Sequence, residues 1–174
     1  FPTETWTIGV IGGMAVDRQD HIWVVQRPGP LRTDDRFNAA GATARQAGIW
    51  LAFHNEPDHM KPIDGVVPLD LFIERTDPAF VRLQLDVCNM TVCGGDPMRY
   101  LARHTQRFGT FHLKDVAADR THDTELGTGI FDLRRFLAAV AGLAGKPCFV
   151  EQEGPKDELS SARRNHDYLR TLEF

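Results

Sequence analysis

The sequence is poor in cysteine, in basic blocks and in long apolar runs. Its three cysteines are an odd number without a CxxC pair, so a disulfide framework is not expected and a reducing compartment is favoured. The net charge is −4 and no Lys/Arg block occurs, which argues against nucleic-acid and anionic-membrane partners. No apolar stretch approaches the roughly 18 residues of a spanning helix. We therefore expect no membrane partner and favour a cytoplasmic location.

The chain also has no initiator methionine, since it starts at Phe1. We expect a fragment or a processed product, from which a targeting signal could be missing. Its 174 residues suffice for one domain, but a complete eight-stranded α/β barrel needs about 250. With 42% hydrophobic and 25% charged residues, the composition is typical of a globular protein with a buried core.

The first part of the chain, residues 1–35, is strand-like. Residues 11–16 and 21–26 are apolar, β-prone runs separated by the polar residues 17–20, which is the pattern of a β-hairpin. Pro28, Gly29 and Pro30 then end this pattern. We therefore treat residues 1–35 as a hairpin segment that is distinct from the remainder of the chain.

Residues 36–174 alternate between helix-like and strand-like stretches. Apolar runs at 49–53, 81–87, 109–113 and 146–150 read as buried strands. Helical patterns occupy 37–47, 68–75, 97–106, 132–144 and 157–172. Such an alternation predicts parallel βαβ units. Half of an eight-stranded barrel and a small open sheet both have this content, and periodicity alone does not separate them.

The carboxyl ends of these predicted strands carry the chemistry of the sequence. Because such ends of parallel strands lie on one face, we expect the side chains that follow them to share one rim. A lone acid or histidine there is usually a helix cap or a core residue, but four strands in register favour a site. Mixed oxygen and nitrogen ligands suit Mn²⁺, Mg²⁺, Co²⁺ or Zn²⁺. The strand-end residues are His54, Asn55, Glu56, Asp86, His112, Lys114, Asp115, Glu151 and Glu153.

Two further patterns are weaker. Cys88 and Cys93 could contribute thiolates to a site, although buried cysteines usually behave as small apolar residues. The stretch from Gly127 to Gly129 could hold an anion through backbone N–H groups. A glycine-rich turn before the next helix is the simpler interpretation.

A series of stretches within residues 36–174 reads LAFHNEPDHMKPIDGVVP, VRLQLDVCNM, GGDPMRYL, FGTFHLKDV, ELGTGIFDLRRFL and FVEQEGP. In this order and spacing they resemble the sugar phosphate isomerase/epimerase group, which has the xylose isomerase-like TIM-barrel fold. The resemblance implies an α/β fold: a partial, half TIM barrel of four parallel βα units, preceded by the N-terminal β-hairpin. The first four βα units of the family are absent from this chain.

By position, the resemblance also implies a ligand set for a divalent metal ion. The family takes its metal ligands from four successive strand ends, which here are Glu56, Asp86, His112 and Glu151. The first of these is the least determined, because many relatives read HNH followed by an acidic residue. We place His54 beside Glu56 in the catalytic pocket and keep His59 as a possible substitute ligand.

The implied activity is that of a metal-dependent sugar or sugar phosphate isomerase/epimerase. Glu56 and Glu151 would move a proton beside a carbonyl from opposite faces, through a metal-bound enediolate. Asn89, Lys114 and Glu153 would contact the small-molecule sugar. The alternatives are an inosose dehydratase-like lyase of the same family, a catalytically incompetent barrel fragment, and a propeller-type binding module.

The last alternative rests on residues 6–31, which contain IGGMAVDRQDHIWVVQRPGPL and resemble a fragment of an NHL-type β-propeller blade. One blade fragment cannot close a propeller.

A half-barrel would expose two sheet edges and the apolar side chains that face the barrel interior. We therefore expect either a homodimer that closes the barrel or a weakly stable monomer, in which the hairpin covers one edge at most.

Overall fold

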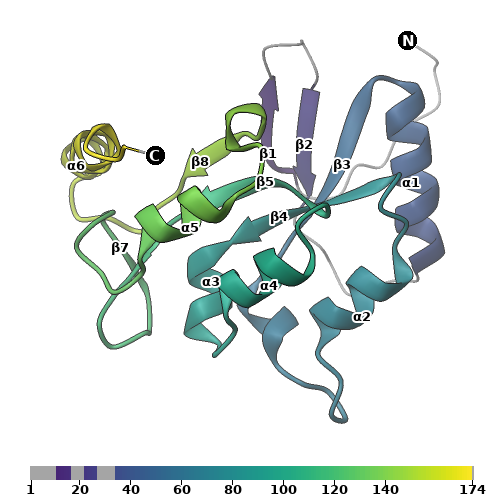
Figure 1. Cartoon of the computed structure of the whole chain (residues 1–174), viewed down its shortest axis with the longest axis horizontal. Helices are drawn as coiled ribbons and strands as arrows, with labels where there is room; N and C mark the ends of the chain where they lie inside the picture. The colour runs from purple at the N-terminus through teal and green to yellow at the C-terminus, as the bar shows by residue number, and fades with distance from the viewer. Residues whose placement is uncertain (1–10, 17–21, 27–33, 174) are drawn as a thin grey trace.

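The computed structural model describes residues 11–16, 22–26 and 34–173, which form a mostly parallel sheet with helices against it (Figure 1). Its strand order is β1-β2-β3-β4-β5-β8, with β1 antiparallel to β2 and the other neighbours parallel. The predicted half-barrel is confirmed in β3, β4, β5 and β8. The strands are β1 (Ile11–Val16), β2 (Ile22–Gln26), β3 (Ile49–His54), β4 (Val81–Asp86), β5 (Phe108–Leu113) and β8 (Cys148–Val150).

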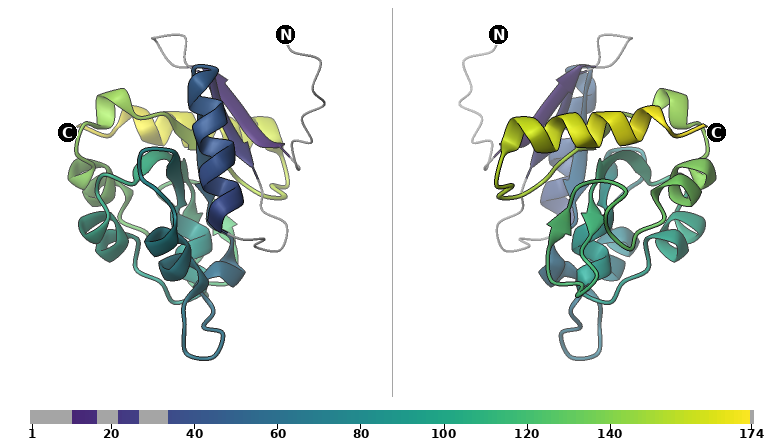
Figure 2. Two further views of the ribbon diagram at one scale, coloured as in Figure 1. Left: turned by 90° about the vertical axis from the view of Figure 1, so that its right-hand side faces the viewer. Right: turned by 90° about the vertical axis from the view of Figure 1, so that its left-hand side faces the viewer.

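Helices follow the strands as the sequence predicts. Asp96, Asp132 and Asp157 cap three of them through side chains that accept backbone N–H groups. Helices α2, α4 and α5 cover one face of the sheet, and α1 and α6 stand at its opposite ends (Figure 2). The helices are α1 (Asp34–Gln46), α2 (Pro68–Arg75), α4 (Pro97–Arg103), α5 (Leu133–Ala139) and α6 (Glu158–Arg170).

The chain departs from the predicted pattern directly after β4. The predicted strand 81–87 ends at Asp86, and Val87 begins the short helix α3 (Val87–Val92). The side chain of Asp86 accepts the Asn89 N–H and thereby caps this helix. The small hairpin β6 (Asp115–Val116) and β7 (Asp123–Thr124) and the 3-10 turns η1 (Pro57–Met60) and η2 (Leu143–Gly145) were also not predicted.

The two faces of the central strands differ in character, because side chains alternate along a strand. Leu83 and Leu85 of β4 join the hydrophobic core between the sheet and the helices, together with Phe111 of β5. On the opposite face, Gln84 lies beside Thr110.

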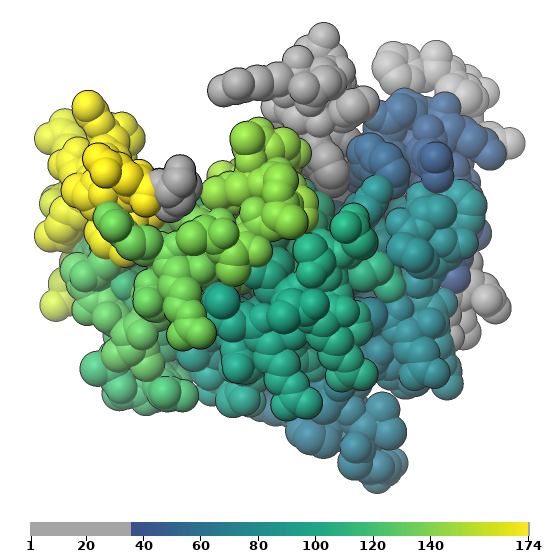
Figure 3. All heavy atoms as spheres, in the orientation of Figure 1, coloured from purple at the N-terminus to yellow at the C-terminus, as the bar shows by residue number. Residues whose placement is uncertain are grey.

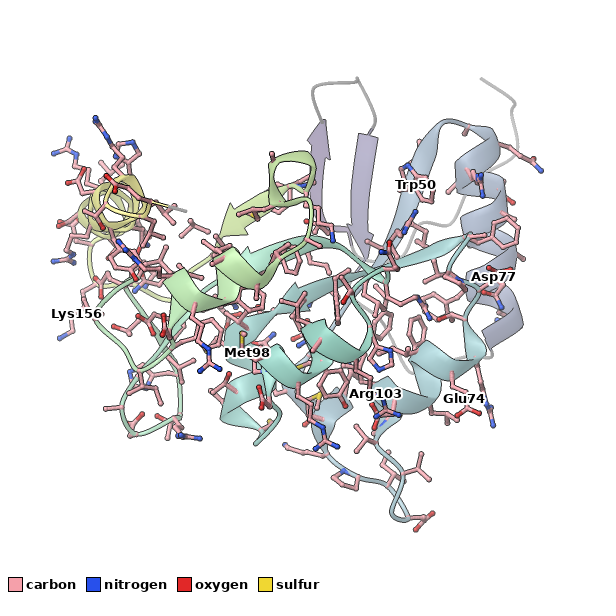
Figure 4. All side chains as sticks on the ribbon, viewed as in Figure 1. Trp50, Glu74, Asp77, Met98, Arg103 and Lys156 are labelled. Atoms are coloured by element: carbon pink, nitrogen blue, oxygen red, sulfur yellow. The ribbon has the colours of Figure 1, made fainter. Side chains whose placement is uncertain are left out.

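This inner face is therefore less apolar than we expected for an opened barrel. Trp50 (labelled in Figure 4) lies on this face and is covered by the Arg82 guanidinium at 4.6 Å from the ring centroid, and Phe149 of β8, opposite His112, lies there too. The expectation of exposed apolar barrel-facing side chains stays a prediction, since Trp50 and Phe149 are both partly buried.

The sheet edge at β3 is occupied by the hairpin. β2 pairs in parallel with β3 from Ile22 opposite Ile49 to Gln26 opposite Phe53. At the other end of the order, no described strand pairs with the far side of β8. A dimer that closed the barrel through both edges would have to displace β2, and it stays a prediction. So does the propeller resemblance, since most of residues 1–35 lies outside the described ranges.

Helices α4 and α5 lie side by side in front of the sheet in Figure 1, and in the same orientation their atoms adjoin on the molecular surface in Figure 3. The rim at the carboxyl ends of the strands is where the polar strand-end residues gather.

Candidate metal centre

Four side chains from neighbouring strands meet at the carboxyl end of the sheet. Each offers one ligand atom, and these atoms all lie within 4.8 Å of one another. The parallel register explains the meeting, because Asp86 at the end of β4 stands opposite His112 of β5. The strand ends on either side supply the other two. The four residues are His54, Asp86, His112 and Glu151.

Asp86 is the centre of this group and is 0% exposed. Its Oδ1 accepts the Asn89 N–H at 2.8 Å, which leaves Oδ2 to face the other members. Oδ2 lies 3.4 Å from His54 Nε2 and 3.7 Å from His112 Nδ1. The capping bond of α3 thus orients the carboxylate toward the two imidazoles.

Asn55 fixes the strand ends that carry the centre, a role that sequence reasoning missed. The Asp86 backbone N–H donates to Asn55 Oδ1 at 2.8 Å, and Asn55 Nδ2 donates to the Asp86 carbonyl at 3.1 Å. Asn55 is buried, so both bonds are shielded from water. Its position between His54 and Glu56 was the available signal, because a buried amide beside a strand end needs partners.

Glu151 and Lys114 complete the contacts. Glu151 Oε2 lies 2.6 Å from His112 Nδ1. The Lys114 ammonium lies 3.1 Å from the same Oε2, 3.2 Å from Asp86 Oδ2 and 3.0 Å from Glu153 Oε1. The two imidazole rings are neighbours as well, with centroids 4.7 Å apart. The centre is therefore a compact network of opposite charges.

The pKa values of both histidines are raised by these carboxylates. Burial lowers the pKa of His54, but hydrogen bonds with Asp86 and Glu56 outweigh burial and raise it to about 9. Burial also lowers the pKa of His112, and hydrogen bonds with Asp86 and Glu151 again raise it above its usual value.

The charged partners shift in the complementary direction. Burial would raise the pKa of Asp86, yet the two imidazoles and the Lys114 ammonium hold it well below its usual range. A hydrogen bond with His112 lowers the pKa of Glu151 to about 2. Burial acts against the charge of Lys114, but the carboxylates around it raise its pKa above the usual value. Both acids are thus held as carboxylates.

Glu56 lies beside this group rather than within it. Its Oε1 is 3.4 Å from His54 Nδ1, and its Oε2 accepts the Asn89 amide at 3.3 Å. The Glu56 backbone N–H donates to His59 Nδ1 at 2.9 Å, so this ring nitrogen of His59 serves the 3-10 turn η1. The structure thus brings His54 into the ligand group where the sequence suggested Glu56, whose ligand role stays a prediction.

The glycine-rich stretch holds an anion that belongs to the protein itself. The buried carboxylate of Asp115 accepts the N–H groups of Gly127 and Gly129 at 2.9 and 3.0 Å. A Cβ atom at Gly129 would clash with the Asp115 carboxylate and the Val116 carbonyl. The stretch is therefore a closed structural turn, in agreement with the simpler interpretation.

The remaining sequence candidates lie outside the cluster. Cys88 is buried, which raises the pKa of its thiol to about 12, and neither Cys88 nor Cys93 belongs to the group that could hold a metal.

No described helix combines the length and the apolar character needed to cross a membrane. The donor set of two imidazole nitrogens and two carboxylate oxygens fits a divalent transition-metal ion.

Comparisons with known proteins agree with this architecture. Residues 32–172 match the family model described as "Xylose isomerase-like TIM barrel". The inosose dehydratase of Salmonella typhimurium is 36% identical over 110 residues, which cover 63% of this chain and 35% of that protein. The inosose dehydratase of Mesomycoplasma hyopneumoniae is 26% identical over 159 residues, covering 78% and 52%. The chain thus spans between about a third and a half of these relatives.

Solved structures share the fold at lower identity. A sugar phosphate isomerase/epimerase from Parabacteroides distasonis superposes with a TM-score of 0.72 at 22% identity, covering 85% of this chain and 59% of that one. An L-ribulose 3-epimerase gives a TM-score of 0.57 at 16% identity, covering 86% and 60%. Each matched structure extends well beyond the part that this chain supplies.

Proposed function

Because the chain belongs to the xylose isomerase-like TIM barrel family, we propose that it carries the catalytic rim of a metal-dependent sugar isomerase/epimerase. The observation that carries this proposal is the cluster of two imidazoles and two carboxylates at the carboxyl ends of the strands. A site of mixed donors at that rim is where enzymes with this fold perform their chemistry.

The metal ligands in this proposal are His54, Asp86, His112 and Glu151. A bound divalent ion supplies electrophilic polarisation of a substrate carbonyl. The protein contributes orientation: the α3 cap directs Asp86 Oδ2 toward the imidazoles, and Asn55 holds the ends of β3 and β4 together.

The acid/base groups in this proposal are Glu56 and Glu151. Each contacts one imidazole of the neighbouring His54 and His112 pair, so the two carboxylates flank the centre from different sides. Their side chains are 31% and 26% exposed, and both can meet a substrate that enters from solvent. One carboxylate would remove the proton beside the carbonyl and the other would return it.

Three further polar groups are proposed to contact the sugar. The amide of Asn89 already donates to Glu56 Oε2, and the Lys114 ammonium lies between Asp86 and Glu151. Glu153 is the most open of the three, with 65% of its side chain exposed. Together they offer donors and an acceptor for hydroxyl groups around the reacting carbon.

A second candidate is an inosose dehydratase-like lyase, which the names of the curated relatives favour. Both reactions begin with removal of a proton beside a carbonyl, but the lyase then loses a hydroxide ion from the neighbouring carbon. Product mass separates the two, since an epimerase leaves the mass of its substrate unchanged and a dehydratase removes one water.

Glu56→Gln tests the proposal, with Asp58→Asn as the control because Asp58 is an exposed carboxylate on the next turn. We expect Glu56→Gln to bind Mn²⁺ as the wild type does and to slow exchange of substrate protons with deuterated water by about 10²-fold or more. NMR of ketose substrates measures the exchange. Full exchange by Glu56→Gln would remove the acid/base role, and absence of exchange in the wild type would favour a catalytically incompetent fragment.

A further inference from the structure

Lys114 is a buried ammonium group within the candidate metal centre. Its side chain is only 2% exposed, and it directly follows β5 where that strand enters the rim. A buried ammonium persists only when nearby negative charge compensates for the lost hydration. The carboxylates around Lys114 therefore compensate for the hydration that its ammonium group loses on burial.

The ammonium contacts the same carboxylate oxygens that the imidazoles approach. Asp86 Oδ2 is 3.2 Å from Lys114 Nζ and 3.4 Å from His54 Nε2. Glu151 Oε2 is 3.1 Å from Lys114 Nζ and 2.6 Å from His112 Nδ1. A divalent ion held by the four-residue cluster would take up these two oxygens and would share them with the lysine.

We propose that Lys114 is an internal counter-cation of the metal centre, which orients the two carboxylates and competes electrostatically with the divalent ion for them. This inference rests on the proposed function, because it concerns the same ligands. It assigns to Lys114 a positioning role toward the metal that is separate from contact with the sugar.

Glu153 gives the lysine a third carboxylate partner. Its carboxylate lies 3.0 Å from Lys114 Nζ, and its side chain is 65% exposed, so it stands on the solvent side of the ammonium. When a divalent ion occupies the inner oxygens, repulsion between the two cations favours the contact of Lys114 with Glu153. Glu153 therefore supports metal binding without being a ligand.

The first test is Mn²⁺ titration by calorimetry of metal-free wild type, Lys114→Met and Lys61→Met. Lys61 is the matched control because it also pairs with a carboxylate, Asp58, but is 65% exposed and outside the rim. We expect Lys114→Met to bind Mn²⁺ at least tenfold more tightly than the wild type, because a unit positive charge close to the ion is removed. Lys61→Met should bind as the wild type does.

A thermal melt supplies the second readout. Metal-free Lys114→Met should melt at a lower temperature than the wild type, because the buried Asp86 and the partly buried Glu151 lose a partner. Saturating Mn²⁺ should restore the lost stability and remove the difference in melting temperature. Equal or weaker Mn²⁺ binding by Lys114→Met, or a loss of stability that Mn²⁺ does not restore, would overturn the inference.

If Lys114→Met does not fold without metal, Glu153→Gln decides the matter. Its exposed side chain can be changed without disturbing the core, and we expect Mn²⁺ binding several-fold weaker than in the wild type, whereas the exposed Glu74→Gln control stays unchanged. Unchanged affinity in Glu153→Gln would count against the inference. A wild type that binds no Mn²⁺ would overturn the proposed function as well, so the two failures are distinguishable.

Discussion

Two buried carboxylates near the end of β5 have opposite kinds of partner. Asp86 is 0% exposed, and its inward oxygen faces two imidazoles and an ammonium group. Asp115 is 1% exposed, and its oxygens accept backbone N–H groups from Val116, Gly127, Gly129 and Phe131. Lys114 and Asp115 are adjacent in the sequence, yet Lys114 belongs to the cluster around Asp86 and Asp115 to the loop of backbone N–H groups.

The difference separates a structural carboxylate from one that can do chemistry. Backbone N–H groups cannot leave or change their charge, so Asp115 joins its loop to the rim permanently. The partners of Asp86 Oδ2 are side chains that can exchange protons, and a divalent ion can replace those protons. A buried acid with side-chain partners is therefore the better indicator of a functional site than burial alone.

The largest expected effect is a loss of folding stability when Asp115 is replaced. Asp115→Ala would leave the buried N–H group of Val116 and the partly buried N–H groups of Gly127, Gly129 and Phe131 without this acceptor. We expect it to destabilise the fold by about 3–4 kcal/mol. Asp115→Asn should cost less, because one acceptor oxygen remains. Urea denaturation measures both.

The matched control for this change is Asp119→Ala, at an exposed acid between β6 and β7 whose described partners are Thr121 and the exposed His122. We expect a loss of less than about 1 kcal/mol there. Adding Mn²⁺ should not recover the stability of Asp115→Ala, since this carboxylate lies outside the ligand group. Recovery by Mn²⁺ would show that the two environments are not separate.

The second largest expected effect is on Mn²⁺ binding at the cluster around Asp86. His112→Ala removes one ligand of the proposed centre while the strand around it stays paired, so we expect Mn²⁺ affinity to fall about 100-fold or more with little loss of stability. Calorimetric titration measures the affinity, with the exposed His122→Ala as the control. Equal affinity in wild type and His112→Ala would remove the centre from this rim.

Sequence patterns predicted those features of the fold and of the candidate site that depend on the local order of residues. Helix α2 begins at Pro68 and ends at Arg75 as predicted, because proline favours a first helical position and Asp77-Pro78 stops the helix. The grouping of Asp86, His112 and Glu151 came from one rule, namely that the carboxyl ends of parallel strands share a rim.

The features that the sequence did not predict depend on contacts between residues that no local pattern contains. Helix α3 was missed because Val87 to Met90 are largely apolar and continue the strand pattern, while the cap that starts the helix needs the orientation of the Asp86 side chain. The partners of Asp115 lie in a loop as far away as Phe131. Likewise, no local pattern showed that the His54 side chain joins the cluster of possible ligands, and the ligand role of Glu56 stays a prediction.

The smallest expected effect is a pH dependence confined to the Asp86 side. The pKa of His54 rises from 6.5 to about 9 on folding, and that of His112 also rises, so both bind protons more tightly in the folded state. Their contribution to stability is therefore complete below about pH 6.5 and is lost as the pH rises through about 9. Thermal melts of metal-free protein should show a fall on the order of 5 °C across this window. His54→Gln should flatten the fall, while Asp115→Asn should lower every melting temperature and leave the slope unchanged. A wild type whose stability is constant from pH 6.5 to about 9 would mean that the imidazoles hold no extra protons, and that the two carboxylates differ less than their contacts indicate.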